Sequence, residues 1–203
     1  IALWKRYAFV SCRQYGVQIL DISNPTAPRH ISFVRVGEVQ SATVSEGILY
    51  CGVWGEMKVV AVDVHDPTYP RVLYELPLQG RGDGVCVRDG ILYAATGQHA
   101  RGIINNSDPT DPAFGKGNGV ECFDVSNPAA PKKIAGTRFE VAYCSAVDMW
   151  EPAFYGDTLV VNNSVLGVYL LDKDLHVKDR LPVVTEGGAV GGVSGREVLD
   201  ELT

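Results

Sequence analysis

The stretch GVQILDISNPTAPRHISFV, from Gly16 to Val34, decides the fold because it returns three more times along the chain. The second copy is KVVAVDVHDPTYPRVLYEL (Lys58 to Leu76), and the third is GVECFDVSNPAAPKKIAG (Gly119 to Gly136). The fourth, GVYLLDKDLHVKDRLPVV (Gly167 to Val184), lacks the Asx-Pro turn of the others. Self-similarity at this spacing predicts a repeat architecture.

Each copy begins with an apolar run that ends in aspartate. These runs are Val17 to Asp21, Val59 to Asp63, Val120 to Asp124 and Val168 to Asp172. Their β-branched and large apolar side chains predict strands that are buried on both faces. We expect each aspartate to accept backbone N–H groups two or three residues ahead, and the Asx-Pro pairs of the first three copies to turn the chain. The motif is therefore strand, rigid turn, strand.

Further strands are predicted before each aspartate-closed run. One set comprises Arg6 to Cys12, Gly47 to Val53, Gly90 to Thr96 and Asp157 to Asn163. A shorter strand precedes three of these, namely Ser41 to Glu46, Gly84 to Asp89 and Cys144 to Trp150. Four antiparallel strands repeated about an axis are typical of propeller blades. We predict an all-β protein, a β-propeller with about four four-stranded blades in this chain.

The segment YAFVSCRQYGVQILDISNPTAP, from Tyr7 to Pro28, resembles the LVIVD-repeat family. In that family an aromatic strand, a glycine, an apolar strand closing on aspartate and an Asx-Pro-x-x-Pro turn build propeller blades. The resemblance covers the first three copies, and in the fourth only the apolar strand. It implies a ring larger than four blades and an extracellular, periplasmic or cell-surface location. The resemblance indicates the fold and says almost nothing about function.

The chain is expected to form one β-propeller domain or part of one. The predicted units are residues 1–36, 37–78, 79–138 and 139–185, with a candidate closing strand in 186–203. The first unit has no predicted initial strand, so Gly188 to Ser194 could pair with Tyr7 to Val10 and close a four-blade ring. The rival is an arc of a six- or seven-blade ring whose remainder lies on a second chain or was cut away. The family resemblance favours the arc.

Composition excludes several classes of function. The chain has 18 lysines and arginines and 24 aspartates and glutamates. This acidic balance argues against a basic surface that binds the phosphate backbone of nucleic acid. No apolar stretch is long enough to span a membrane. No P-loop, dinucleotide fingerprint, nucleophile elbow or zinc-protease motif occurs, so no cofactor and no metal are predicted. The five cysteines lie in predicted strands and are expected to be buried thiols, with a Cys51–Cys86 or Cys12–Cys51 bridge as the alternative.

The third unit carries an insertion. The interval from Asp63 to Asp124 is about nineteen residues longer than that from Asp21 to Asp63. The extra residues run from Gly97 to Asn118, GQHARGIINNSDPTDPAFGKGN, between the second and third strands of the unit. In propellers this connection lies on the face that usually receives ligands, and long loops of this kind are more often functional than decorative.

Candidate ligand-binding residues share this predicted face. They are Trp54, Arg81, Asp83, His99, Arg101 and Tyr143. Arginine can grip a carboxylate in bidentate fashion, and an indole can stack a sugar ring or a partner's side chain. His99 and Tyr143 are the candidates for a catalytic acid or base.

Two other motifs favour simpler interpretations. Asn105, Asp108 and Asp111 could suggest a calcium site, but Pro109 and Pro112 interrupt the alternate-residue spacing and SDPTDP echoes the Asx-Pro turns. A turn is the better interpretation. The RGD string at Arg81 to Asp83 is explained by a glycine-flanked turn that leads into a strand.

Two functions remain open. The first is a non-enzymatic scaffold whose loop-rich face binds a protein or glycan ligand. The alternative is a propeller-type polysaccharide lyase or glycoside hydrolase acting on an acidic glycan, with Arg81, His99, Arg101 and Tyr143 in the cleft. The alternative rests on analogy of fold.

Overall fold

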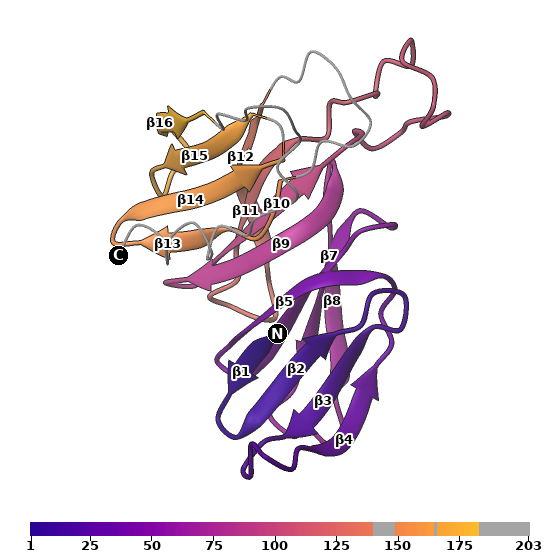
Figure 1. Ribbon diagram of the computed structural model, residues 1–203, viewed down its shortest axis with the longest axis vertical. Coiled ribbons are helices and arrows are strands. Elements are labelled where there is room, and N and C mark those ends of the chain that lie inside the picture. Colours follow the sequence, from indigo (N-terminus) through magenta and orange to yellow (C-terminus); the bar gives the residue numbers. More distant parts are fainter. Residues whose placement is uncertain (140–148, 165, 183–203) are drawn as a thin grey trace.

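In the part of the chain that the structure describes, the strands form four antiparallel sheets of four strands each (Figure 1). The computed structural model describes residues 1–139, 149–164 and 166–182. The prediction of an all-β chain with four-stranded antiparallel blades is confirmed. This described part contains no helix long and apolar enough to cross a membrane.

Every sheet follows the chain in order from one edge to the other. The first sheet contains β1 (Ala2–Trp4), β2 (Tyr7–Ser11), β3 (Val17–Asp21) and β4 (Arg29–Val34). The second contains β5 (Val39–Ser45), β6 (Ile48–Val53), β7 (Lys58–Asp63) and β8 (Arg71–Pro77). The third contains β9 (Arg81–Arg88), β10 (Ile91–Gly97), β11 (Gly119–Asp124) and β12 (Lys132–Arg138). The fourth contains β13 (Ala153–Tyr155), β14 (Thr158–Asn163), β15 (Gly167–Leu171) and β16 (Val177–Leu181).

The aspartates cap the third strands as the sequence predicts. The Asp21 carboxylate accepts the backbone N–H of Ser23 at 2.9 Å and its hydroxyl at 2.6 Å. Asp63, Asp124 and Asp172 each accept the N–H two residues ahead in the same way. Each carboxylate therefore stops its strand and starts the turn to the next one.

One prediction about the sheet edges needs correction. The first unit does contain an initial strand, because β1 pairs with β2 through Ala2 and Phe9, Leu3 and Ala8. This short strand was missed because it has only three residues, and it occupies the edge proposed for a closing strand at Tyr7 to Val10. The proposed closing strand itself, Gly188 to Ser194, lies outside the described residues. In the fourth sheet the first described strand is β13, and most of the predicted strand Cys144 to Trp150 lies outside the described residues.

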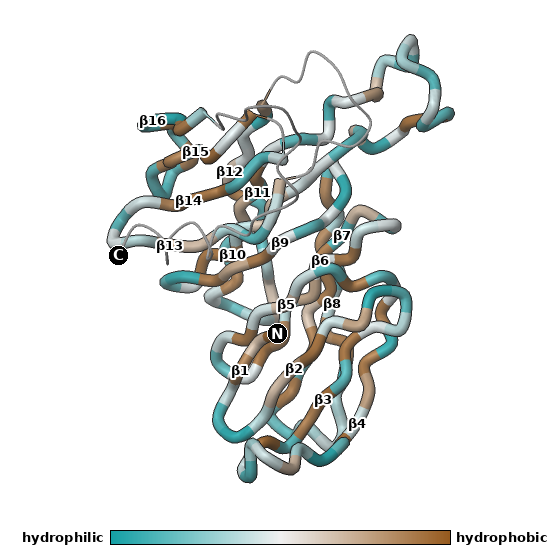
Figure 2. Tube along the Cα trace, viewed as in Figure 1, coloured by the Kyte–Doolittle hydropathy of each residue, from teal (hydrophilic) through white to brown (hydrophobic). Residues whose placement is uncertain are grey.

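Among the described residues, apolar side chains from neighbouring sheets form three core clusters. One joins the first and second sheets, the next joins the second and third, and the last joins the third and fourth. Figure 2 shows apolar residues along the strands and hydrophilic residues at many of the turns. Strands β7 and β11 are buried along almost their whole length, which confirms the prediction of two covered faces for these copies.

Glycines let β9, the first strand of the third sheet, approach β6 of the second sheet and the segment before β13 of the fourth. A Cβ atom on Gly52 would lie 2.5 Å from the carbonyl oxygen of Asp83, and one on Gly84 would lie 2.2 Å from the Cα of Glu151. Side chains at these positions would push the sheets apart.

The described cysteines are free thiols. Cys51 and Cys122 are buried, and Cys12 and Cys86 are partly buried. Neither of the two bridges considered from the sequence is formed. Burial raises the pKa of the Cys51 and Cys122 thiols to about 12, which keeps both protonated and unreactive at neutral pH.

Candidate functional site

The insertion between β10 and β11 projects from one end of the third sheet (Figure 1, upper right). Its turns are built by side-chain oxygens. Asp108 accepts the Thr110 N–H at 2.8 Å, and Asp111 accepts the Ala113 and Ile104 N–H groups, both at 2.9 Å. The pKa of Asp108 is lowered by the Thr110 hydroxyl and N–H, and that of Asp111 by N–H groups. The turn interpretation of SDPTDP is therefore confirmed.

His99 lies at the base of the insertion and is 1% exposed. Its Nδ1 accepts the backbone N–H of Gly115 at 3.0 Å, and its ring centroid lies 4.7 Å from that of Phe114. The imidazole thus joins the two ends of the insertion. A substrate could not reach it in this arrangement.

Arg101 fastens the insertion to the second sheet. Its backbone N–H donates to the Gln79 carbonyl at 2.7 Å, and its Nε donates to the Leu78 carbonyl at 2.8 Å. Its Nη2 also donates to the carbonyl of Met57. These contacts use the guanidinium for main-chain carbonyls rather than for a ligand.

Glu121, on β11, is a buried carboxylate that the sequence interpretation missed. It is 0% exposed and accepts the Gln79 N–H at 2.7 Å and the Arg138 guanidinium at 2.6 Å, and it also pairs with Lys133. Burial by itself raises the pKa of this carboxyl, but Lys133, the Gln79 N–H and Arg138 outweigh it and lower the pKa. The repeat alignment could have identified Glu121. At the same position of the buried strand the other copies have Gln18, Val60 and Tyr169, so an acidic side chain there needs charged or hydrogen-bonding partners.

Residues 78–80 are therefore held from two sides. Arg101 binds the carbonyls of Leu78 and Gln79, while Glu121 binds the Gln79 N–H. This segment leads directly into β9, whose first residue is Arg81. The clamp fixes the main chain that presents the Arg81 side chain.

Arg81 lies over Trp54, with its Cζ 4.1 Å from the ring centroid. Trp54 belongs to the β6–β7 turn, so the pair spans the second and third sheets. The Arg81 Nε is buried and has no hydrogen-bond partner, and no carboxylate of the described residues pairs with this guanidinium. A cation that is stacked but not neutralised suits an incoming anion.

Only some of the six candidate ligand-binding residues lie together at the end of the sheets that carries the insertion. Trp54 and Arg81 are in direct contact, and Arg101 and His99 support the insertion beside them. Asp83 is 4% exposed, inside the sheet interface rather than on the loop face. Tyr143 lies outside the described residues. Among the residues described, no group of three or more His, Cys, Asp or Glu side chains could hold a metal ion.

A comparison with family models gives a match to the LVIVD repeat over residues 1–34 and 36–74. The chain carries LVIVD repeats. The first match covers the first sheet, and the second covers β5 to β7 and most of β8. The resemblance drawn from the Tyr7 to Pro28 segment is confirmed. A comparison with curated proteins gives no match.

Solved structures similar to this LVIVD-repeat chain are propeller-like. A computationally designed protein, Ika8, has a TM-score of 0.58 at 9% identity, over 88% of this chain and 47% of Ika8. A nidogen/laminin complex has a TM-score of 0.58 at 15% identity, over 89% and 62% of the two chains. BamB from Moraxella catarrhalis has a TM-score of 0.57 at 13% identity, over 90% and 48%. The β-propeller prediction is confirmed, and the chain spans 47–62% of the length of these structures.

Proposed function

We propose that this LVIVD-repeat chain is a binding scaffold whose loop face binds a protein partner. An acidic side chain of the partner would pair with the Arg81 guanidinium. The observation that carries the proposal is the Arg81 guanidinium, stacked on Trp54 and not neutralised by any described carboxylate. Tryptophan and arginine are the residue types that dominate binding energy at protein interfaces. A rigid scaffold with one such anchor is suited to binding.

The clamp on residues 78–80 supports this proposal because it removes motion from the anchor. Arg101 and Glu121 fix the main chain that leads into Arg81. A side chain held in place before binding loses less conformational entropy when the partner arrives. The buried polar contacts therefore favour affinity without touching the partner themselves.

The tip of the insertion favours a protein over a glycan. Ile104 is 96% exposed, and the Asp111 carboxylate fixes its N–H in a turn. An apolar side chain on an ordered turn offers contact area to an apolar patch of a protein. A sugar, which presents hydroxyl groups, gains less from it. We include an extracellular, periplasmic or cell-surface location in the proposal.

Catalysis on an acidic glycan has weaker support. His99 is buried and engaged with Gly115, and Arg101 is engaged with main-chain carbonyls. Four residues were assigned to that cleft, and three of them are described. Among these three, Arg81 is the one whose side chain forms no hydrogen bond or ion pair with the described residues.

The proposal is tested by selecting a phage-displayed random peptide library on the chain, beside a panel of uronate oligosaccharides. We expect enrichment of peptides that contain Asp or Glu. Arg81→Gln should weaken their binding about tenfold to a hundredfold, as for a charge-assisted hydrogen bond. Arg13→Gln is the matched control, because Arg13 is exposed but already paired with Glu38 at 2.9 Å. Equal binding by wild type and Arg81→Gln would contradict the proposal, and binding of uronates alone would favour the glycan alternative.

We further propose that the four sheets are an arc of a larger ring completed by further blades. Leu3, on the first strand of the first sheet, is 66% exposed. A cavity of about 350 Å³ lies along the initial strands, lined by Leu3, Val44 and Glu151 among others. Light scattering tests the arc. A well-folded monomer of this chain would count against the arc, and a larger assembly would support it.

A further inference from the structure

Each sheet after the first packs one face against the sheet before it, and the same repeat positions make the contact every time. One position lies on the second strand, and the other lies directly opposite it on the third strand, just before the capping aspartate. These pairs are Leu49 with Val62, Leu92 with Phe123, and Leu159 with Leu171. Each pair belongs to the core cluster shared with the preceding sheet, and none of the six side chains is more than 2% exposed.

The first sheet carries the same pair on a face that no described sheet covers. Ala8 lies opposite Leu20, and Leu20 directly precedes the Asp21 cap. Neither side chain belongs to a core cluster of the described residues. Leu20 is partly exposed, and Leu3, which lies opposite Ala8 on its other side, is 66% exposed. Ala8 is small and stands between these two leucines, which leaves it 6% exposed.

This open face has the composition of a packed one. Its second strand also contributes Val10, which is partly exposed. In the other sheets the residues equivalent to Val10 are 0% exposed, namely Cys51, Ala94 and Val161. The polar side chains beside this uncharged strip, Gln18 and His30, bond to each other at 3.3 Å. A sheet face that meets only water carries polar residues at such positions, so these apolar side chains mark a contact surface.

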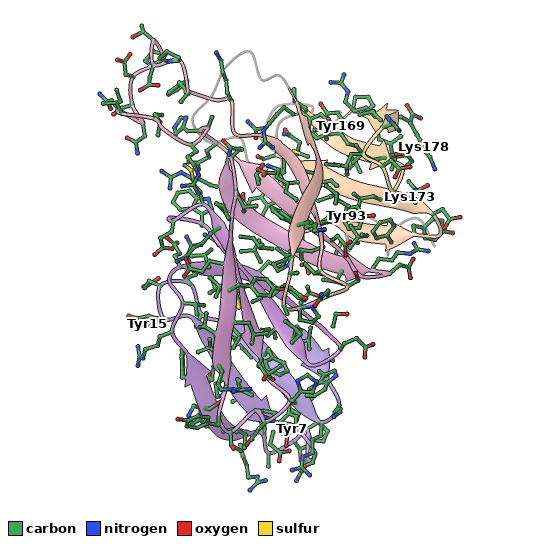
Figure 3. The ribbon with its side chains drawn as sticks, turned by 180° about the vertical axis from the view of Figure 1, so that it is seen from behind. Tyr7, Tyr15, Tyr93, Tyr169, Lys173 and Lys178 are labelled. Atoms are coloured by element: carbon green, nitrogen blue, oxygen red, sulfur yellow. The ribbon has the colours of Figure 1, made fainter. Side chains whose placement is uncertain are left out.

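The opposite face of the first sheet is already used. Phe9 and Ile19 point the other way and pack in the core shared with the second sheet, where both are 0% exposed. The fourth sheet is at the other end of the molecule, as Figure 3 shows for Tyr7 of the first sheet and Tyr169 of the fourth. The open face therefore lies at one end of the stack of sheets.

We propose that this open face binds a further four-stranded sheet of the same repeat type, supplied from outside residues 1–203. The proposal rests on the larger ring proposed above, and it names the surface and the occupant at one end of the arc. The contacts between the described sheets define the chemistry of the occupant. It presents apolar side chains at the positions of Phe9 and Ile19, because these share a core with Leu49 and Val62.

Two other sources of a cover fit less well. Residues 183–203 number 21, half of the 42-residue interval from Asp21 to Asp63, so they are too few for a four-stranded sheet. A second copy of this chain would have to offer the far face of its fourth sheet to continue the same stacking. Val160 and Val168 on that face are 2% and 8% exposed, so it is already covered.

Thiol labelling of a Leu20→Cys variant tests the face, because iodoacetamide reacts much faster with exposed thiols than with buried ones. In the chain as it stands, the thiol at position 20 should react about tenfold faster or more than the thiol of Val62→Cys, the equivalent position in the second sheet. A copy of residues 1–41, one repeat, is then joined ahead of Ile1 as the probe. With this unit in place, labelling at position 20 of the original unit should slow about tenfold or more.

Two substitutions within the added unit identify the contact. Ile19→Asp there, on the face toward the junction, should restore fast labelling at position 20 of the original unit. Leu20→Asp there, one residue further and on the outward face, should not. Val177→Cys is the matched labelling control, since Val177 is 48% exposed on β16 and should react equally in both chains. Peptide mapping assigns each thiol.

Unchanged labelling at position 20 in the extended chain would overturn the proposal, because the face would then have failed to bind a sheet of its own type. Protection that grows with concentration in the unextended chain would overturn it as well, because the occupant would then be a second copy. Light scattering of the unextended chain judges the ring separately. A monomer would count against the arc, while protection by the added unit would still establish the face.

Discussion

The Glu121 carboxylate accepts the Gln79 N–H at 2.7 Å, although the two residues are 42 positions apart in the chain. This bond joins β11 of the third sheet to the connection between β8 and β9. The same carboxylate pairs with Arg138 and Lys133, whose side chains are 34% and 42% exposed. One buried charge therefore holds together a sheet and the loop that presents Arg81.

Glu121→Gln should lower the free energy of unfolding by about 1–3 kcal/mol, because hydrogen bonds to a charged group are lost in a buried position. Glutamine can still accept the Gln79 N–H but no longer neutralises Arg138. Urea denaturation measures the change. Glu75→Gln is the control, since Glu75 pairs with Lys58 at 2.9 Å while 55% exposed, and it should cost less than about 0.5 kcal/mol. Equal losses in the two variants would contradict the role given to Glu121.

Acid should weaken the fold through Asp21. The Ser23 hydroxyl and N–H, together with Arg29, lower the pKa of the Asp21 carboxyl from 3.8 to about 2. Because the unfolded chain takes up protons first, this contribution is complete above about pH 4 and is lost as the pH falls toward 2. We expect the urea midpoint of the wild type to fall across that window.

Asp21→Asn should reduce this pH dependence in part, because it removes one of the carboxyls whose pKa is lowered by folding; the pKa of Asp63 is also lowered to about 2. Asp157→Asn is the control, since the Asp157 side chain is 97% exposed, and it should keep the wild-type slope. A slope for Asp21→Asn as steep as that of the wild type would show that other carboxyls govern the acid transition.

Arg101→Gln should loosen the insertion without unfolding the sheets. The variant loses the bonds to the carbonyls of Leu78 and Met57, and residues 97–118 then depend on fewer contacts. Hydrogen exchange followed by mass spectrometry should show amides of 97–118 exchanging about tenfold faster, with little change in β2 and β3. Arg13→Gln, on the same face, should leave the insertion as protected as in the wild type.

Thiol labelling should separate the described cysteines by burial. Cys51 and Cys122 are 0% and 1% exposed, and burial raises their pKa to about 12. At pH 8 we expect iodoacetamide to modify Cys12, which is partly buried, well before these two. Peptide mapping after timed quenching assigns each site. Labelling of Cys51 or Cys122 at the rate of Cys12 in native protein would contradict the packing of β6 and β11.

The strands and their aspartate caps could be predicted because the sequence features that specify them span only a few residues. An apolar run that ends in aspartate specifies a buried strand and its cap, as Asp21 and Asp63 show with Ser23 and His65. The three-residue strand β1 was missed because no repeat signal marks so short a segment.

The candidate site was only partly predictable. Trp54 and Arg81 could be placed on one face by counting strands, and the structure brings them into contact. His99 and Arg101 were expected to face a ligand, yet their side chains contact Gly115 and the carbonyls of Leu78 and Met57. A polar residue in a loop looks the same in sequence whether it meets solvent or main chain.

By itself the sequence determined the repeat, the four-stranded unit, the aspartate caps and the position of the insertion, because periodicity and turn chemistry act over a few residues. Only the tertiary structure decided that Glu121 binds Gln79 and that Arg101 supports residues 78–80. These relationships join different sheets. They depend on how close the sheets pack, and nothing within one unit records that distance.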